Sequence, residues 1–436
     1  MFAHSVSIPK EDCAAEWQAL WQQLPTSAAV FALHGPELSG TDITDEPYIT
    51  KTANLRRRLQ RLLSPDATAS KRLNLAGRVS RIAYTLTGSD LETALLLYTA
   101  TRQVFGDRAR KRLHLRPPAV LRMAWENAHP RVYATHRVAQ RSLEHTFGPF
   151  ASRVAAERFL DDSLNLFLLR RCTDDLHPDP AFPGCIYSEM KMCLAPCFLG
   201  CTEQRYAAEA EAVRDYFATR GASLLAALEQ DRNDASAALD FEKAAQLHAR
   251  IQKVKAIAQQ AAPLVHPLAD LDAVILQMAA SSGENAAHVA VFLVRAGMLY
   301  GPALYSVQGM VHPNEQSGSS SLFAHPVTLA PTPLQTSEAA APKATRYLLE
   351  DRLRDLLESL QVQAASARPA SDLRMDHLAL LARWYYRPTA KRTGEIFFRE
   401  AGEEFPLPKI LRGISRVARG ARNPEDAEAV TIPILP

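Results

Sequence analysis

The stretch CTDDLHPDPAFPGCIYSEMKMCLAPC, residues 172–197, contains four of the six cysteines of this 436-residue chain. Twelve, seven and three residues separate them in turn. Four prolines interrupt the stretch, so a long helix or strand is not expected there. Backbone hydrogen bonds alone cannot hold such a loop, so either disulfides or a metal centre hold its shape or the loop is flexible. The four cysteines are Cys172, Cys185, Cys193 and Cys197.

The compartment decides between disulfides and metal. The N-terminal residues MFAHSVSIPKEDCAAEW contain no apolar run of signal-peptide length, and no run of about 18 apolar residues occurs. We therefore expect a cytoplasmic protein with reduced thiols, in which clustered cysteines are typical metal ligands. Only Cys193 and Cys197 form a close pair, which favours an iron–sulfur centre over zinc. The alternative is a set of free cysteines packed like small apolar side chains.

Positive charge is concentrated in one region. The net charge is only +3, yet residues 51–116 hold fifteen basic and four acidic side chains. Such a field attracts phosphate backbones, so the region predicts contact with nucleic acid. A solvated helix face is the alternative and explains part of the pattern. The candidate DNA-binding residues are Lys51, Arg56, Arg57, Arg61, Lys71, Arg72, Arg110, Lys111 and Arg112.

The first hundred residues predict a small α/β domain. Residues 28–33 form an apolar run suited to a buried strand, and residues 47–50 suit a second strand. Asn54 is a good N-cap for a basic helix with leucines along one face, LRRRLQRLL. Further helices are expected at about 70–83 and at 89–105.

Several short motifs then carry a family resemblance. Val30-Phe31, Tyr48 to Lys51 and Asn54 to Leu59 resemble the GIY-YIG nuclease domain, and more narrowly the UvrC subunit of the bacterial excision-repair nuclease. The similarity covers about residues 28–305, with the motifs in the family order. Later segments similar to the family are Glu92–Leu97, Phe147–Phe150, Leu168–Cys172 and Leu239–Ala245.

The resemblance implies a nuclease centre that is incomplete here. Tyr48 and Arg58 occupy two catalytic places, but the first-motif tyrosine is Phe31 and the metal-binding glutamate is Tyr98. A phenol, protonated near neutral pH, is a poor ligand for a divalent cation. Glu92 lies six residues before Tyr98 and should point elsewhere. The cleavage chemistry is therefore predicted to be impaired or absent, and Mg²⁺ or Mn²⁺ is expected only if the centre is active.

The resemblance also implies a four-iron cluster on the four cysteines singled out above. Cys201, three residues beyond Cys197, is a competing ligand, and Cys13 is expected to be a bystander. The cluster's role would be structural or redox-sensing.

A helical hairpin follows the cysteines. Residues 203–230 predict a long helix that Gly221 can interrupt, and short helices flank Asp240, the predicted N-cap of FEKAAQLHARIQKVKAI. A single hairpin cannot bury its own apolar face and needs a partner. By resemblance the partner is a UvrB-like helicase subunit; packing within the chain is the alternative. The predicted contact set is Phe241, Glu242, Ala245 and Leu247.

The rest of the chain predicts a helix at 152–169, an antiparallel meander at 270–308 and helices at 346–363, 373–386 and 410–419, with a short strand at 393–398. The family's second, RNase-H-like nuclease half is not recognisable. The fold class is α/β plus α. The expected parts are a GIY-YIG-like α/β domain (1–108), a connecting region with the cysteine cluster (109–202), a UVR hairpin (203–262), the meander (263–310), a linker (311–345) and a C-terminal helical segment (346–436).

Two functions remain open. One is an excision-repair protein that incises DNA through a weakened GIY-YIG centre. The other is a non-catalytic scaffold or regulator that binds DNA and a UvrB-like partner and holds a structural cluster.

Overall fold

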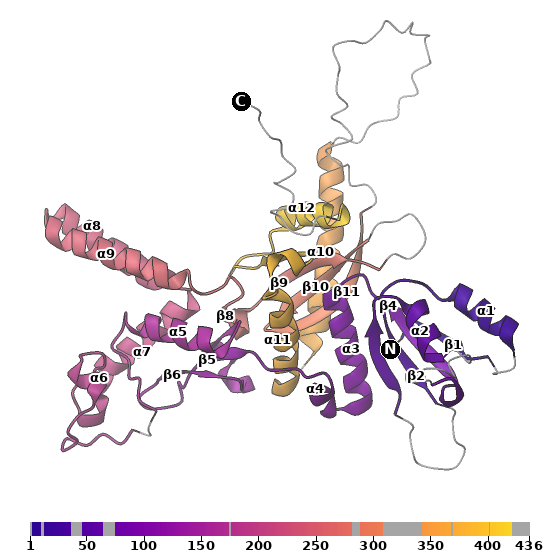
Figure 1. Cartoon of the computed structure of the whole chain (residues 1–436). Coiled ribbons are helices and arrows are strands. Elements are labelled where there is room, and N and C mark those ends of the chain that lie inside the picture. The colour runs from indigo at the N-terminus through magenta and orange to yellow at the C-terminus, as the bar shows by residue number, and fades with distance from the viewer. Residues whose placement is uncertain are drawn as a thin grey trace, which may run out of the picture.

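The computed structural model describes residues 2–9, 13–35, 46–63, 75–173, 176–280, 288–307, 342–367, 369–400 and 402–420. These residues form three four-stranded antiparallel sheets and the helices around them (Figure 1). A mixed α/β fold is therefore confirmed at this level. The described part contains no helix long and apolar enough to cross a membrane.

The N-terminal sheet has the order β1-β4-β2-β3. Ala29, Phe31 and Leu33 alternate toward a core shared with the leucines of α2, and the Asn54 side chain accepts a hydrogen bond from Arg57 N at 2.9 Å. The two predicted strands, the basic helix and its cap are confirmed. The elements are β1 (His4–Ser7), α1 (Ala14–Gln23), β2 (Ala29–His34), β3 (Tyr48–Thr52), α2 (Leu55–Leu63) and β4 (Arg81–Leu86).

The expected helix at 70–83 is wrong in its described part. Residues 64–74 lie outside the description, residues 76–78 form one 3₁₀ turn, and β4 begins at Arg81. The segment RIAYTL alternates, with Ile82 and Tyr84 facing the core that contains α2. A period of two places such residues on one face of a sheet, which a helix cannot do.

The second face of this sheet is covered by α3 (Asp90–Phe105), the helix predicted at 89–105, which Ser89 caps and which packs across β2 and β3. A short helix, α4 (Arg108–Arg112), follows. The middle region has a sheet of order β6-β5-β7-β8. Its elements are β5 (Ala119–Met123), β6 (Val132–Thr135), β7 (Thr146–Phe150), α5 (Arg153–Leu164) and β8 (His266–Pro267). The helix predicted at 152–169 therefore ends five residues early.

The cysteine stretch is irregular, as predicted, with only α6 (Ile186–Glu189) and one 3₁₀ turn at Pro196–Phe198. Beyond it lie α7 (Glu203–Ala218), α8 (Ala222–Ala237) and α9 (Phe241–Ala258). The helix predicted at 203–230 is broken at Gly221, where φ is +91° and an added Cβ would lie 3.2 Å from Ala258 Cβ. The short helix predicted at 235–239 is the end of α8. Asp240 caps α9 by accepting from Lys243 N at 3.0 Å, as predicted.

The third sheet has the order β11-β10-β9-β12. It contains the predicted meander and, beside β9, a strand from the C-terminal segment, which is therefore not wholly helical. Glu395 on β12 forms a bidentate ion pair with Arg416 on α12. The elements are β9 (Ala273–Met278), β10 (His288–Arg295), β11 (Met298–Ser306), α10 (Pro342–Ser366), α11 (Ser371–Tyr385), β12 (Glu395–Phe398) and α12 (Leu407–Ala418). Most of the predicted linker lies outside the described residues.

One apolar core joins these parts. Tyr98 of α3, Val120 of β5, Ile275 of β9 and Leu378 of α11 belong to the same buried cluster. The α8–α9 hairpin instead projects away from the body of the molecule (Figure 1).

Candidate functional site

The predicted nuclease centre is divided between the two faces of the N-terminal sheet. Strand register places Tyr48 opposite Leu33 and Thr50 opposite Phe31, so these side chains share the α2 face. Phe31 is fully buried beneath α1 and α2, whereas Tyr48 is 37% exposed. Arg58 is half-buried on α2. The fold therefore places the remaining candidate residues on one side of the sheet.

Tyr98 lies on the other side. It is 1% exposed, and its hydroxyl donates a hydrogen bond to Asp376 Oδ2 on α11 at 2.9 Å. Burial first, and then the neighbouring Asp376 carboxylate, raise the pKa of Tyr98 above its usual range. The phenol therefore stays protonated and acts as a donor, not as a metal ligand.

The Asp376 carboxylate is itself fully engaged. Its Oδ1 accepts from Arg110 Nε at 2.5 Å, and its Oδ2 lies 3.5 Å from Arg102 Nη1. Arg102 also pairs with Asp372 at 3.2 Å. We call Tyr98, Arg102, Arg110 and Asp376 the α3–α11 network. Two guanidinium groups and a phenol already contact the oxygen atoms of the Asp376 carboxylate, which leaves it poorly placed to bind a metal cation.

Glu92 has a different role. Its Oε2 accepts from Gly88 N at 2.7 Å, while Ser89 accepts from Glu92 N, so the pair caps α3. Burial raises the pKa of Glu92 despite these backbone hydrogen bonds. Its carboxylate contacts the start of α3, while Tyr98 contacts α11, and the two do not form one site.

The predicted DNA-binding residues fall into two groups. Arg56 donates to the carbonyls of Leu24 (2.7 Å) and Gln22 (3.0 Å), and Arg110 belongs to the α3–α11 network. Arg112 pairs with Glu46 at 2.6 Å. The side chains of these three cations already make hydrogen bonds or ion pairs within the protein. Lys71 and Arg72 lie outside the described residues. The cations that are exposed and make no ion pair with a described residue are Lys51, Arg57, Arg61 and Lys111.

The four clustered thiols lie in one electrostatic neighbourhood. Burial raises the pKa of Cys193 to about 11, and the thiols of Cys172, Cys185 and Cys197 add to the shift. Burial raises the pKa of Cys201, Arg205 opposes this shift, and Cys197 adds to it. Within the described ranges, no group of three His, Cys, Asp or Glu side chains is close enough to hold a metal ion as it stands.

Donors do point at these sulfur atoms. Ala195 N lies 3.3 Å from Cys193 Sγ, and Arg170 Nη1 lies 3.6 Å from Cys172 Sγ. The Cys185 side chain accepts from the backbone at the start of α6. Hydrogen bonds of this kind accompany thiolates that ligate iron. The donor set therefore fits an iron–sulfur centre chemically.

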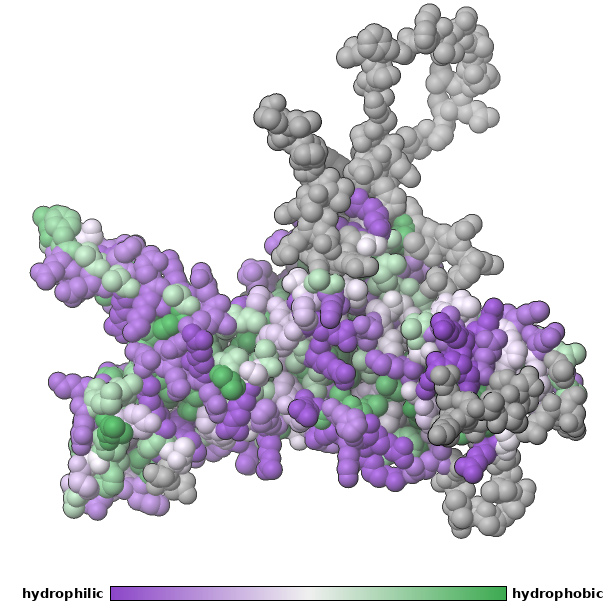
Figure 2. All heavy atoms as spheres, in the orientation of Figure 1, coloured by the Kyte–Doolittle hydropathy of each residue, from purple (hydrophilic) through white to green (hydrophobic). Residues whose placement is uncertain are grey.

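The tip of the hairpin carries exposed apolar side chains. Leu239 is 72% exposed and Phe241 is 67% exposed, and Figure 2 shows the apolar tip of this projection. Glu242 and Ala245 are also exposed, while Leu247 is half-buried against the middle core. Leu239 was not among the predicted contacts. Its position just before the N-cap Asp240 is the sequence feature that places it at the tip of the hairpin.

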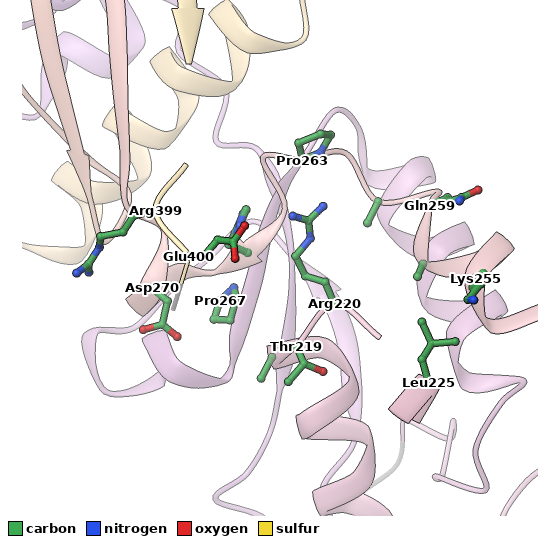
Figure 3. Close-up of a pocket in the computed structure, with 14 residues that line it drawn as sticks. Thr219, Arg220, Leu225, Lys255, Gln259, Pro263, Pro267, Asp270, Arg399 and Glu400 are labelled. Atoms are coloured by element: carbon green, nitrogen blue, oxygen red, sulfur yellow. The ribbon is translucent and has the colours of Figure 1, made fainter. Parts of the chain in front are cut away.

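A separate cavity of about 690 Å³ lies at the base of the hairpin, between the α7–α8 turn, the end of α9 and the segment after β12. Arg220 points into it (Figure 3). Its lining contains both basic and acidic side chains, including Lys255, Asp270 and Glu400. None of the predicted site residues lines it.

Comparison with known protein families gives matches for the middle region and for the α8–α9 hairpin. Residues 119–216 match the model of the UvrC/Cho excinuclease middle domain, and residues 222–257 match the UvrB/uvrC motif. No solved structure matches the chain.

Curated relatives named UvrABC system protein C extend the similarity. The chain is 27% identical to the protein of Alcanivorax borkumensis over 58% of its length, and 28% identical to that of Haemophilus ducreyi over 59%. It spans 41% of the length of each of these two relatives. The chain is therefore UvrC-like: its residues 119–216 are similar to the middle domain of that family and its residues 222–257 to the UVR motif.

Proposed function

We propose that this protein is a DNA-binding component of UvrABC-type nucleotide excision repair that docks a UvrB-like helicase subunit through the α8–α9 hairpin. The observation that carries this proposal is the exposed apolar tip on the UVR motif. The curated relatives are named as UvrABC system proteins, and the chain spans less than half of their length.

The hairpin supports docking through its division into a packed base and an uncovered tip. Ile251, Val254 and Ile257 are buried near the base. Leu239 and Phe241 have no such cover among the described residues and are more than half exposed. Pairs of helices bury such a face against another helical element, and a hairpin of the same kind on the partner suits this geometry.

Phe241→Asp is expected to weaken binding of a UvrB-type C-terminal hairpin at least tenfold. Burying a phenylalanine contributes about 2 kcal/mol, and an aspartate at the same place would be desolvated without a partner. Calorimetric titration with the partner hairpin measures the change. Val362→Asp on α10, where Val362 is 69% exposed, is the matched control and should bind normally. Equal affinity of both variants would refute the docking proposal.

The exposed cations support contact with DNA. Lys51, Arg57, Arg61 and Lys111 keep their charges available to phosphates. Binding through such contacts falls steeply with salt.

We infer that the GIY-YIG-like centre does not cleave DNA, which favours the scaffold over the weakened nuclease. The support is the α3–α11 network, in which the place of the metal-binding glutamate holds a buried phenol. Tyr48 and Arg58 keep the ability to hold a phosphate.

A reaction with lesion-bearing duplex, Mg²⁺ or Mn²⁺ and the helicase and loader subunits should therefore show no strand cleavage by this protein. Metal-assisted hydrolysis needs an anionic oxygen ligand, and the residue in the place of the glutamate is the buried phenol of Tyr98. Gel analysis of the labelled duplex measures incision. Cleavage that disappears in Arg58→Ala would establish an active centre with another metal ligand and would restore the enzyme assignment.

We further propose that Cys172, Cys185, Cys193 and Cys197 hold a four-iron cluster, with zinc as the alternative. Protein purified without oxygen should be brown and contain about four iron atoms per chain by elemental analysis. Cys193→Ser should lose most of the iron, because it removes one of the four proposed thiolate ligands. Cys201→Ser is the control and should keep it. One zinc per chain, with no iron, would overturn the cluster.

A further inference from the structure

Two recessed pockets meet where the N-terminal, middle and C-terminal parts of the chain join. The larger has a volume of about 640 Å³ and the smaller about 250 Å³. Leu113, Leu115 and Arg383 line both pockets, so the two recesses are adjacent, and we call them together the α11 groove. Figure 1 shows α11 beside α3, with α4 close to the same junction.

The charge of the α11 groove is strongly one-sided. One carboxylate, that of Asp90, is among its lining residues. Asp90 pairs with Arg387 at 2.5 Å, and two further cations pair with acids outside the lining: Arg112 with Glu46 and Arg153 with Glu157. The basic residues of the groove are Lys51, Arg112, Arg116, Arg153, Arg383 and Arg387.

Three of these cations lack a counter-charge. Lys51, Arg116 and Arg383 are exposed and make no hydrogen bond or ion pair through their side chains with the described part of the chain. They come from β3, from the segment before β5 and from α11. Uncompensated cations gathered from separate elements create a field that attracts a polyanion.

Arg383 is placed there by the packing of its helix. Every residue of α11 from Arg374 to Trp384 is buried except Arg383. Trp384 is 3% exposed, and its indole donates to Thr393 O at 3.2 Å. The ring is therefore fixed in the core and cannot stack on a base, while the neighbouring guanidinium opens into the groove.

The shape of the groove selects the form of the polyanion. Its walls combine cationic groups with apolar side chains, including Leu113, Leu115 and Ala379. A rigid duplex cannot enter recesses of this size, whereas the phosphates and sugars of one strand can. Grooves that bind unpaired strands use positive charge that follows the strand's backbone.

We propose that the α11 groove binds the backbone of an unpaired nucleic-acid strand, so that the C-terminal segment takes part in strand binding. The proposal deepens the proposed function and rests on its claim that the protein binds DNA. It adds Arg116 and Arg383 to the residues expected to contact phosphates.

The test compares two charge-reversed pairs. Arg116→Glu combined with Arg383→Glu changes the groove. Arg57→Glu combined with Arg61→Glu changes exposed cations on α2, which packs on the other face of the N-terminal sheet. Fluorescence anisotropy measures the binding of an oligothymidylate of about 20 nucleotides, and of a matched duplex, at several salt concentrations.

The groove variant should bind the single strand at least about tenfold more weakly, with a slope of log K against log salt reduced by about 1.4. Its duplex binding should change much less. Single-strand affinity equal to that of the unaltered protein would overturn the proposal, as would an equal loss for strand and duplex. Absence of single-strand binding by the unaltered protein would also overturn it.

The outcomes also separate this proposal from the proposed function. If the α2 variant loses duplex binding while the groove variant binds DNA normally, the proposed function is supported and the groove proposal is refuted. If the unaltered protein binds neither single-stranded nor duplex DNA, both the proposed function and the groove proposal are refuted. Both altered side chains of the groove variant are exposed, so its melting temperature should match that of the α2 variant.

Discussion

Asp376→Ala should lower the free energy of unfolding by about 3 kcal/mol. The carboxylate is 1% exposed and accepts from Tyr98 and Arg110, with Arg102 close by. Its removal leaves a buried phenol without an acceptor and two half-buried guanidinium groups without their counter-charge. Loss of one partner of a buried pair costs about 3–5 kcal/mol, and the partial exposure of both arginines favours the lower end. Urea unfolding followed by circular dichroism measures the change.

Asp372→Ala is the matched control for this experiment. Asp372 lies one helical turn earlier on α11 and also pairs with Arg102, but its side chain is 44% exposed. Exposed ion pairs contribute about 0–1 kcal/mol, so this variant should stay close to the unaltered protein. An Asp376→Ala loss as small as that of Asp372→Ala would show that the α3–α11 network does not hold the C-terminal segment against α3.

His377 should make the protein lose stability as the pH falls from about 6.5 to about 4. Burial, followed by the charge of Arg102, lowers the pKa of His377 to about 4. Its Nδ1 accepts from Leu299 N at 3.1 Å, which requires a neutral ring, and Arg374 is also close enough to disfavour its protonation. Between these pH values the unfolded chain binds the proton and the folded chain does not. Stability due to His377 is therefore complete above pH 6.5 and is lost progressively below it, by about 3 kcal/mol in total.

The measurement is urea unfolding at intervals between pH 4.5 and 7.5. His377→Gln keeps an acceptor for Leu299 N without a titrating ring, so its stability should depend less steeply on pH. His266 has a pKa of about 4 for the same main reason, burial, and should contribute to the slope that remains. A slope that is identical in the variant and the unaltered protein would contradict the role given to His377.

These two predictions concern contacts of Asp376 and His377 that no local sequence pattern predicts. Asp376 and His377 are adjacent in the sequence, and neither is among the predicted site residues. The partner of Asp376, Tyr98, lies 278 residues away. A hydrogen bond across that separation depends on how α3 and α11 pack, and neither helix contains the information by itself.

Local physical chemistry did determine several parts from the sequence alone. Asn54 and Asp240 start their helices because a short polar side chain accepts a backbone N–H in the first turn. The apolar run at 28–33, the irregular loop at 172–197 and the apolar tip at Phe241 likewise depend on near neighbours. The UVR motif identified from residues 239–245 agrees with the match over 222–257.

Tertiary structure decided the rest. The basic region was predicted as one DNA-binding surface, yet Arg56 and Arg110 are used inside the fold while Arg383 joins the exposed cations. Helix periodicity places an arginine on a face but does not say what packs against that face. Strand β12 pairs with β9, and residues 81–86 with β2, because sheet hydrogen bonds form between segments distant in the chain. The sequence therefore determined the elements and their caps, whereas packing across long separations decided which charges remain available to a ligand.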